Sequence, residues 1–212
     1  MKNKKISFIT KVAIFSALSS ILYVVPGLQF PLPFFPPFLK IQFSNFPAIL
    51  CGFITGPLGG VLVILIKVIV KILFTWSDTM LVGEVADVII GLSVVLSSSI
   101  IYRKMHNKKG GILAISISTL VWVVVAVLIN WLLLIPNYIV LLFDGNVSAF
   151  VGLCSVIPGI NETNYMSFYL LFGALPFNLL LAVISNGATF IVYKKTSQLF
   201  KKIDWHLHLK MI

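Results

Sequence analysis

The chain has 212 residues, of which 59% are hydrophobic and only 10% are charged. Its mean hydropathy is +1.06, and water-soluble domains of this length do not have so apolar a composition. These values exclude an ordinary soluble domain and predict an integral membrane protein.

The formal net charge of +10 comes from basic residues that gather in short clusters between apolar stretches. In a soluble protein such a charge would suggest nucleic acid. Here it predicts membrane topology and no nucleic-acid partner, because Lys and Arg are enriched in cytoplasmic loops. The clusters are Lys2, Lys4, Lys5 and Lys11; Arg103, Lys104, Lys108 and Lys109; and Lys194, Lys195, Lys201, Lys202 and Lys210. We expect all three clusters, and therefore both termini, to be cytoplasmic.

Six apolar stretches predict an all-α integral membrane protein, a single domain over residues 1–212 built as a bundle of six transmembrane helices. A helix needs about 20 apolar residues to cross a hydrocarbon core of about 30 Å. The predicted spans are residues 8–25, 45–55, 57–74, 81–102, 111–143 and 166–193. The second has about 11 residues and rises only about 17 Å. It must be extended by the loop before it or be shielded inside the bundle.

The connection between the first two spans, residues 26–44, is unusually rich in proline and phenylalanine. Residues 30–47 hold five of the ten prolines of the chain. Proline cannot continue a helix, and the phenylalanines make this segment too apolar for a solvated loop. We therefore expect a packed lid over a binding site.

Four charged side chains lie within or beside the third and fourth spans. Lys67 and Lys71 are one helical turn apart and share a face. Glu84 and Asp87 open the next span and are the expected counter-ions. Charged groups inside spans are costly and therefore point to function. Alternatively, the four charged groups extend to the outer membrane–water interface or form a structural ion pair.

Two amides lie inside the later spans, Asn130 in the fifth and Asn178 in the sixth. A buried amide must find hydrogen-bonding partners, and two of them can recognise a polar heterocycle. The alternative is hydrogen bonding between helices. Pro136 predicts a kink near the outer end of the fifth span.

Small residues on the first span permit close approach of another helix. Ala13 and Ala17 are four residues apart, with Ser16 and Ser20 alongside. They predict either a docking patch for a partner protein or a contact within the bundle.

The chain contains no sequence motif for catalysis or for ATP binding. It has no Gly-x-x-x-x-Gly-Lys-Ser/Thr loop, no nucleophile elbow, no paired-histidine pattern and no Cys-x-x-Cys. Cys51 and Cys154 lie in different regions, and we interpret both as unpaired packing residues. We expect no catalytic residue, no metal site and no ATPase site in this chain.

The tail, residues 196–212, mixes apolar side chains, among them Trp205, with lysines. This composition is typical of a short helix that lies on the cytoplasmic membrane surface.

Taken in order, a series of short motifs resembles the riboflavin-specific substrate-binding S components of energy-coupling factor (ECF) transporters. The motifs are residues 30–39, Phe43, Ser44 and Pro47, Gly52 and Phe53, Gly56 and Pro57, Gly60, Ile66 and Lys67, residues 83–86, Gly91, residues 128–131, Pro136 and residues 176–178. The resemblance covers nearly the whole chain, roughly residues 8–200.

The resemblance implies a multi-pass protein of the cell membrane that captures riboflavin from outside under the first long loop. Its partners would be a transmembrane coupling subunit and two cytoplasmic ATPases that use ATP. It would hold no permanent cofactor. Ala13 and Ala17 would face the coupling subunit. The candidate substrate-binding residues are Leu39, Lys40, Gln42, Asn45, Lys67, Glu84, Asp87, Asn130 and Asn178.

The chain departs from the family pattern at a few polar positions. The family usually has acidic residues at Gln42 and Asn45, an Asn or similar residue at Val68 and Asp87, and often a Lys at Leu181. One missing partner at a buried site costs about 1–3 kcal/mol. We therefore expect ligand preference to be decided at these positions.

Three other functions compete with a riboflavin S component. One is an S component for another vitamin or heterocycle. Another is an independent secondary transporter with an ion path along Lys67, Lys71, Glu84 and Asp87. The third is a membrane enzyme or assembly factor, which the missing catalytic motifs disfavour.

Overall fold

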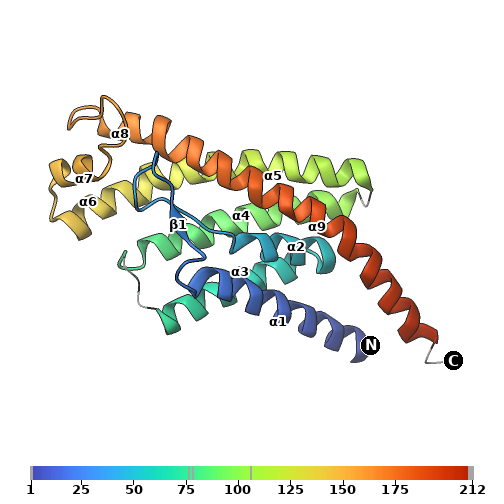
Figure 1. Ribbon diagram of the computed structural model, residues 1–212. Coiled ribbons are helices and arrows are strands. Elements are labelled where there is room, and N and C mark those ends of the chain that lie inside the picture. The colour runs from blue at the N-terminus through green and yellow to red at the C-terminus, as the bar shows by residue number, and fades with distance from the viewer. Residues whose placement is uncertain (1, 76, 78, 106, 210–212) are drawn as a thin grey trace.

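A computed structural model describes residues 2–75, 77, 79–105 and 107–209, without the side chains of Lys2, Lys108 and residues 194–209. The fold is almost entirely helical (Figure 1). Its helices are α1 (Lys2–Val24), α2 (Asn45–Thr55), α3 (Pro57–Phe74), α4 (Val82–Lys104), α5 (Lys108–Ile129), η1 (Asn130–Leu134), α6 (Ile135–Phe143), α7 (Val147–Leu153), α8 (Tyr165–Phe168), η2 (Tyr169–Ala174) and α9 (Leu175–Leu209). Two short strands, β1 (Phe30–Pro31) and β2 (Lys40–Ile41), pair antiparallel within the first long loop.

Within the described residues, five helices are long and apolar enough to cross a membrane. Two of them run through several of these elements: α5, η1 and α6 are continuous over Lys109–Phe143, and α8, η2 and the first part of α9 over Tyr165–Tyr193. Their apolar length confirms the prediction of a helical protein with several possible spans.

The short helix α2 has the predicted bounds and lies inside the bundle. It contacts α1, α3, α4 and α9, and Ala48, Ile49 and Cys51 on it are completely buried. Gly56, at a φ of +93°, links it to α3. This positive φ favours glycine, which has no Cβ to clash. Of the two possibilities for a short second helix, the structure has the shielded one.

Two predicted boundaries differ from the observed ones by more than three residues. Helix α1 begins at Lys2, because the basic residues before the apolar stretch are compatible with a helix. Helix α9 continues to Leu209, where a separate surface helix was predicted from residue 196. No proline or glycine interrupts it there, so the helix does not end. The position of Trp205 lies outside the described side chains.

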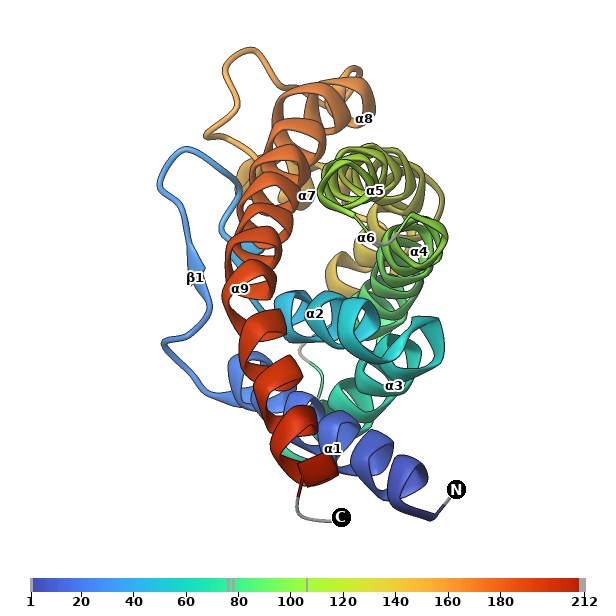
Figure 2. The same cartoon turned by 90° about the vertical axis from the view of Figure 1, so that its right-hand side faces the viewer.

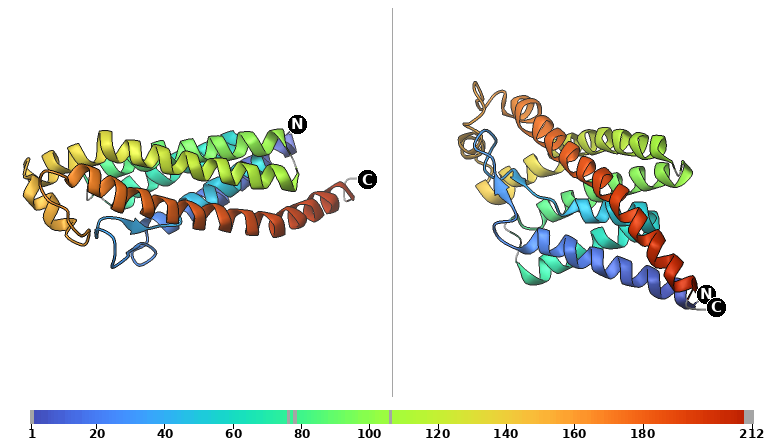
Figure 3. Two further views of the ribbon diagram at one scale, coloured as in Figure 1. Left: turned by 90° about the horizontal axis from the view of Figure 1, so that it is seen from above. Right: turned by 45° about the vertical axis from the view of Figure 1, so that its right-hand side comes forward.

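The two ends of the bundle differ in what they carry. Both chain termini lie at one end, here called the terminus end, and α7 with the first long loop lies at the other, the loop end (Figures 1 and 3). Figure 2, which looks along the bundle, shows α2 between α3 and α9. This arrangement places the lid, α7 and the beginning of α4 around one end of the molecule.

Two segments of π-helix interrupt the long helices near the loop end. The first, η1, comes just before Pro136, and the second, η2, just before Pro176. Proline lacks the N–H that would continue the α-helical pattern, and π-turns are a known response inside helices, often at functional sites. A kink was predicted near Pro136, and the structure has a π-helical segment just before this proline. The second such segment, before Pro176, was not predicted.

Candidate ligand-binding cavity

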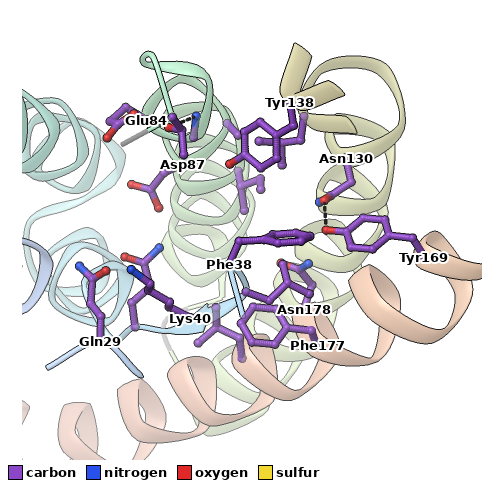
Figure 4. Close-up of a pocket in the computed structure, with 18 of the residues that line it drawn as sticks. Gln29, Phe38, Lys40, Glu84, Asp87, Asn130, Tyr138, Tyr169, Phe177 and Asn178 are labelled. Carbon is purple, nitrogen blue, oxygen red and sulfur yellow. Dashed lines mark hydrogen bonds between the residues drawn. The ribbon is translucent and has the colours of Figure 1, made fainter. Parts of the chain in front are cut away.

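A cavity of about 360 Å³ opens at the loop end of the bundle. Ligand pockets for small molecules usually measure about 300–1,000 Å³. The predicted candidates on its wall are Leu39, Lys40, Gln42, Asn45, Glu84, Asp87, Asn130 and Asn178. Residues from four separate parts of the sequence thus meet in one place (Figure 4).

Aromatic side chains form much of the wall, and the lid contributes the central one. The ring of Phe38 reaches in between Tyr138 and Tyr169 (Figure 4), with ring centroids 6.0 Å and 5.7 Å away. It also contacts Phe150 of α7 at 6.0 Å. These rings supply the flat apolar surfaces on which an aromatic ligand stacks.

A second aromatic contact fastens the loop to α9. Phe35 is buried and meets Phe177 edge to face, at a centroid distance of 5.3 Å. By contrast, Phe34 on the same loop is 62% exposed. The loop is therefore packed on the bundle by selected phenylalanines, as expected for a lid.

Asn130 lies on η1, where it joins two helices at the cavity wall. The hydroxyl of Tyr169 donates to Asn130 Oδ1 over 2.8 Å, and Asn130 Nδ2 donates to the carbonyl of Ala126. The bond from Tyr169 connects η1 with η2, the two π-helical segments. The predicted alternative of hydrogen bonding between helices is thus present at a residue that also lines the cavity.

Asn178 has the same dual position on α9. Trp122 Nε1 donates to Asn178 Oδ1 over 3.3 Å, and Asn178 Nδ2 donates to the carbonyl of Ala174. Both Trp122 and Asn178 line the cavity. Each carbonyl oxygen of these amides has a second lone pair that a ligand donor can use.

Glu84 lies at the start of α4 and is held by hydroxyl groups. Ser77 and Thr79 both donate to Glu84 Oε2, over 2.6 Å and 3.1 Å. Within the described residues Glu84 has no lysine as partner, and Lys71 Nζ donates instead to Thr75 Oγ1. The prediction that Glu84 is a counter-ion of the lysines was therefore wrong. The hydroxyls of the short loop before α4 satisfy it locally.

Asp87 and Lys67 form the predicted ion pair. Lys67 Nζ lies 2.7 Å from Asp87 Oδ2, and it also donates to Ser44 Oγ and to Asn45 Oδ1. Lys67 is completely buried and is not part of the cavity wall, whereas Asn45 and Asp87 are. Of the candidate binding residues, Lys67 alone lies behind the wall.

The C-terminal part of the lid brings three candidates to the cavity edge. Leu39 is half-buried, and Lys40 on β2 is exposed. Gln42 accepts a hydrogen bond from Ser44 Oγ over 3.2 Å. Leu181, at which the sequence was expected to depart from the family it resembles, is buried on the cavity wall. The positions that depart from the family pattern thus include several that face the cavity.

Cys154, which follows α7, packs beside the aromatic wall. It belongs to a buried cluster with Ile135, Phe150 and Tyr169. Burial raises the pKa of its thiol to about 12, so the thiol stays protonated at neutral pH. Cys51 is also buried and free. Both cysteines are therefore unpaired packing residues, as predicted.

On α1, the two pairs of small residues face in different directions. Ser16 and Ser20 are buried against the bundle, whereas Ala13 and Ala17 are exposed on the outer face. Exposed Ile14 and Leu18 lie on the same side. The serines are thus contacts within the bundle, and the alanines are accessible to another helix.

Several cavity residues were not predicted: Tyr23, Gln29, Phe38, Trp122, Tyr138, Phe150, Tyr169 and Phe177. Aromatic residues are common in membrane spans and at their ends, so their presence alone carries little information. A useful signal was available in the two prolines inside helices. The segments before Pro136 and Pro176 carry Asn130 and Tyr169, and Asn178 follows Pro176 directly on the same helix.

Comparison with known proteins agrees with this architecture. A family model described as "ECF transporter, substrate-specific component" matches residues 7–193. The riboflavin transporter RibU of Staphylococcus aureus (strain TCH60) is 29% identical over 188 residues, which are 89% of this chain and 90% of the relative. The riboflavin transporter FmnP of Bacillus subtilis (strain 168) is also 29% identical over 188 residues, with 88% and 92% covered.

A solved structure described as the S component of a bacterial ECF transporter has the same fold. It matches with a TM-score of 0.69 and 25% sequence identity, over 95% of this chain and 99% of the other. The family model covers most of the chain, and the apolar helices agree with it. The protein is therefore a multi-pass membrane protein that belongs to the family of substrate-specific (S) components of ECF transporters.

Proposed function

We propose that this chain binds riboflavin in the cavity at the loop end and serves as the S component of a riboflavin importer. The observation that carries the proposal is the cavity itself, which combines aromatic rings with five amide side chains and two carboxylates. Two relatives that cover most of the chain are named riboflavin transporters. Aromatic walls with a few placed polar groups suit a flat heterocycle with a polyhydroxylated side chain.

In this proposal the isoalloxazine ring stacks near Phe38 and Tyr169, and Asn130 and Asn178 meet its polar edge. Glu84 and Asp87 accept hydrogen bonds from ribityl hydroxyls or from the ring N–H, since carboxylates are acceptors only. Leu39, Lys40, Gln42 and Asn45 close the site from the lid side. Riboflavin is the transported ligand, and the chain has no permanent cofactor.

The proposal includes a topology of six spans, with α2 as the shielded second one and both termini in the cytoplasm. The three basic clusters support it, because all of them would then be on the cytoplasmic side. The loop end with its cavity would face outward.

Transport would need partners. Ala13 and Ala17 on the exposed face of α1 would contact a transmembrane coupling subunit, and two cytoplasmic ATPases would supply the energy from ATP. The small side chains support this because they allow another helix to approach closely. This chain contributes no ATPase site of its own.

The test is riboflavin binding by the purified protein. Riboflavin fluorescence should be quenched on addition of the detergent-solubilised chain, with saturation at a one-to-one ratio. Other heterocycles are then added to the complex, and recovery of riboflavin fluorescence shows which of them displace the bound riboflavin. The absence of quenching at micromolar riboflavin would contradict the proposal.

A second candidate ligand is another vitamin or heterocycle. The observation in its favour is the polar set of the cavity, in which Gln42, Asn45 and Leu181 differ from the family pattern. Mass spectrometry of the small molecule that co-purifies distinguishes the two.

A further inference from the structure

The ammonium group of Lys67 has three hydrogen-bond donors and meets three oxygen atoms. They are Ser44 Oγ at 2.9 Å, Asn45 Oδ1 at 2.6 Å and Asp87 Oδ2 at 2.7 Å. Each comes from a different element: the end of the lid, α2 and α4. Lys67 donates hydrogen bonds to the first two oxygens and forms an ion pair with the third. It is completely buried behind the cavity wall, so its ammonium contacts protein oxygens and does not reach a ligand.

The ring of Tyr23 completes the surroundings of this cation. Lys67 Nζ lies 4.8 Å from the ring centroid, within the usual range for a cation–π contact. Tyr23, Asn45 and Asp87 all line the cavity, although Lys67 itself does not. One buried cation thus contacts three wall residues, on α1, α2 and α4.

Asp87 keeps hydrogen-bonding capacity toward the cavity. Its Oδ2 is paired with Lys67, and its Oδ1 accepts a long bond of 3.4 Å from Asn45 Nδ2. A carboxylate offers about four lone-pair sites. The remaining ones are available to a donor on the ligand, and Figure 4 shows the carboxylate beside the open space.

Packing alone does not account for a lysine at this position. A completely buried ion pair is often replaced by apolar residues without loss of stability, because burial of the charges is costly. The cost is better explained if the pair has a role in the adjacent site. Removal of one partner leaves the other charge buried and unpaired, which disturbs the wall directly.

We propose that Lys67 is a positioning residue, which fixes Asp87 and Asn45 as a hydrogen-bonding wall for the ligand without touching it. This inference rests on the proposed function of the cavity. Because Lys67 balances the charge of Asp87, this part of the wall accepts hydrogen bonds but is neutral overall. It therefore suits an uncharged donor, such as a hydroxyl or a ring N–H, and disfavours a cation.

The test is a double-mutant cycle with riboflavin as the probe. Lys67→Met and Asp87→Asn are prepared singly and together, and the dissociation constant is measured by fluorescence quenching on the folded fraction from size-exclusion chromatography. We expect each single variant to bind about tenfold or more weakly. In the Asp87→Asn background, Lys67→Met should change affinity less than about threefold, because its effect passes through Asp87.

Lys71→Met is the matched control. It removes the same charge one helical turn away, but Lys71 Nζ donates to Thr75 and not to Asp87. The fold-change in the dissociation constant caused by Lys71→Met should be the same in the wild-type chain and in the Asp87→Asn variant, as for independent sites. The comparison thus separates a specific coupling from a general loss of positive charge.

The outcomes are distinct. A further tenfold loss on adding Lys67→Met to Asp87→Asn would overturn the inference, because Lys67 would then act independently. Unchanged affinity of folded Lys67→Met, with only a lower melting temperature, would also overturn it. If that single variant does not fold, the comparison within the Asp87→Asn background still decides. If the wild-type chain itself does not quench riboflavin fluorescence, this result contradicts the proposed function, and the inference about Lys67 falls with it.

Discussion

The loop end and the terminus end of this bundle are built from similarly apolar helices, yet the ligand cavity described above opens at the loop end. Toward the terminus end, small residues bring helices into direct contact. A Cβ on Gly60 of α3 would overlap Val95 Cγ1 and lie 2.8 Å from the carbonyl oxygen of Ala48. One on Gly52 would lie 3.2 Å from Ser99 Cβ.

At the loop end, aromatic side chains line the cavity, and two of the long helices contain π-helical segments. The π-helical segments η1 and η2 carry Asn130 and Tyr169 toward each other, and Phe38 enters from the lid. The difference teaches that the cavity coincides with local breaks in helix geometry. Neither hydrophobicity nor aromatic content separates the two ends, because Phe53, Tyr102 and Tyr193 pack directly against one another toward the terminus end. Close packing at one end gives the other a rigid base.

The largest expected effect comes from the close contact toward the terminus end. Gly60→Ala should lower the free energy of unfolding by about 3 kcal/mol, because the new Cβ overlaps a backbone oxygen and a buried valine. The melting temperature in detergent measures this.

Gly152→Ala is the matched control for Gly60→Ala. Gly152 lies on α7, where an added Cβ would meet nothing within 4 Å and φ is not positive. The same substitution should leave stability unchanged or slightly improved, since alanine favours helix. Equal effects at the two glycines would contradict the contrast between the two ends.

The next effect concerns the lid. Phe38→Ala should weaken riboflavin binding about tenfold, or about 1.4 kcal/mol, because it removes the ring between Tyr138 and Tyr169. Titration of riboflavin with the variant gives the affinity from fluorescence quenching. Dilution of the preformed complex gives the dissociation rate of riboflavin, which should be higher than for the wild-type chain.

Phe34→Ala serves as the comparison for the lid variant. Phe34 belongs to the same loop but is mostly exposed, with its ring contact to Phe35. Its removal should change affinity less than about twofold. A similar loss in both variants would mean that the loop acts through its general apolar character and not through Phe38.

The smallest effect concerns the bond between the two π-helical segments. Tyr169→Phe removes the donor to Asn130 Oδ1 and should cost about 1 kcal/mol of stability. Tyr165→Phe is the control, because the described residues give Tyr165 a ring contact with Phe150 but no hydroxyl bond. Thermal unfolding of both variants would show whether this bond matters. Equal melting temperatures would argue against it.

Much of the fold could be predicted from local patterns. The bounds of α2 and α3 follow from Ser44, Gly56 and Pro57, where turn residues interrupt apolar stretches. The lid was predicted from its prolines and phenylalanines. The extension of α9 to Leu209 was not, because a change in composition was taken for a helix end.

The candidate site could be predicted only as a set of polar residues. Eight of the nine predicted binding residues line the cavity, and Lys67 lies behind it. A polar group in a span must find a partner, but the sequence does not specify whether that partner belongs to the ligand or to the protein. For Lys67 the partners are Ser44, Asn45 and Asp87.

The sequence by itself determined that this is a helical membrane protein with an apolar lid and costly polar groups in its spans, because apolar length and proline placement are local properties. The tertiary structure decided which face each residue occupies. Ala13 points outward and Ser16 inward, although both are small and three residues apart. That choice depends on how the helices rotate and pack against one another, and contacts between distant segments set it.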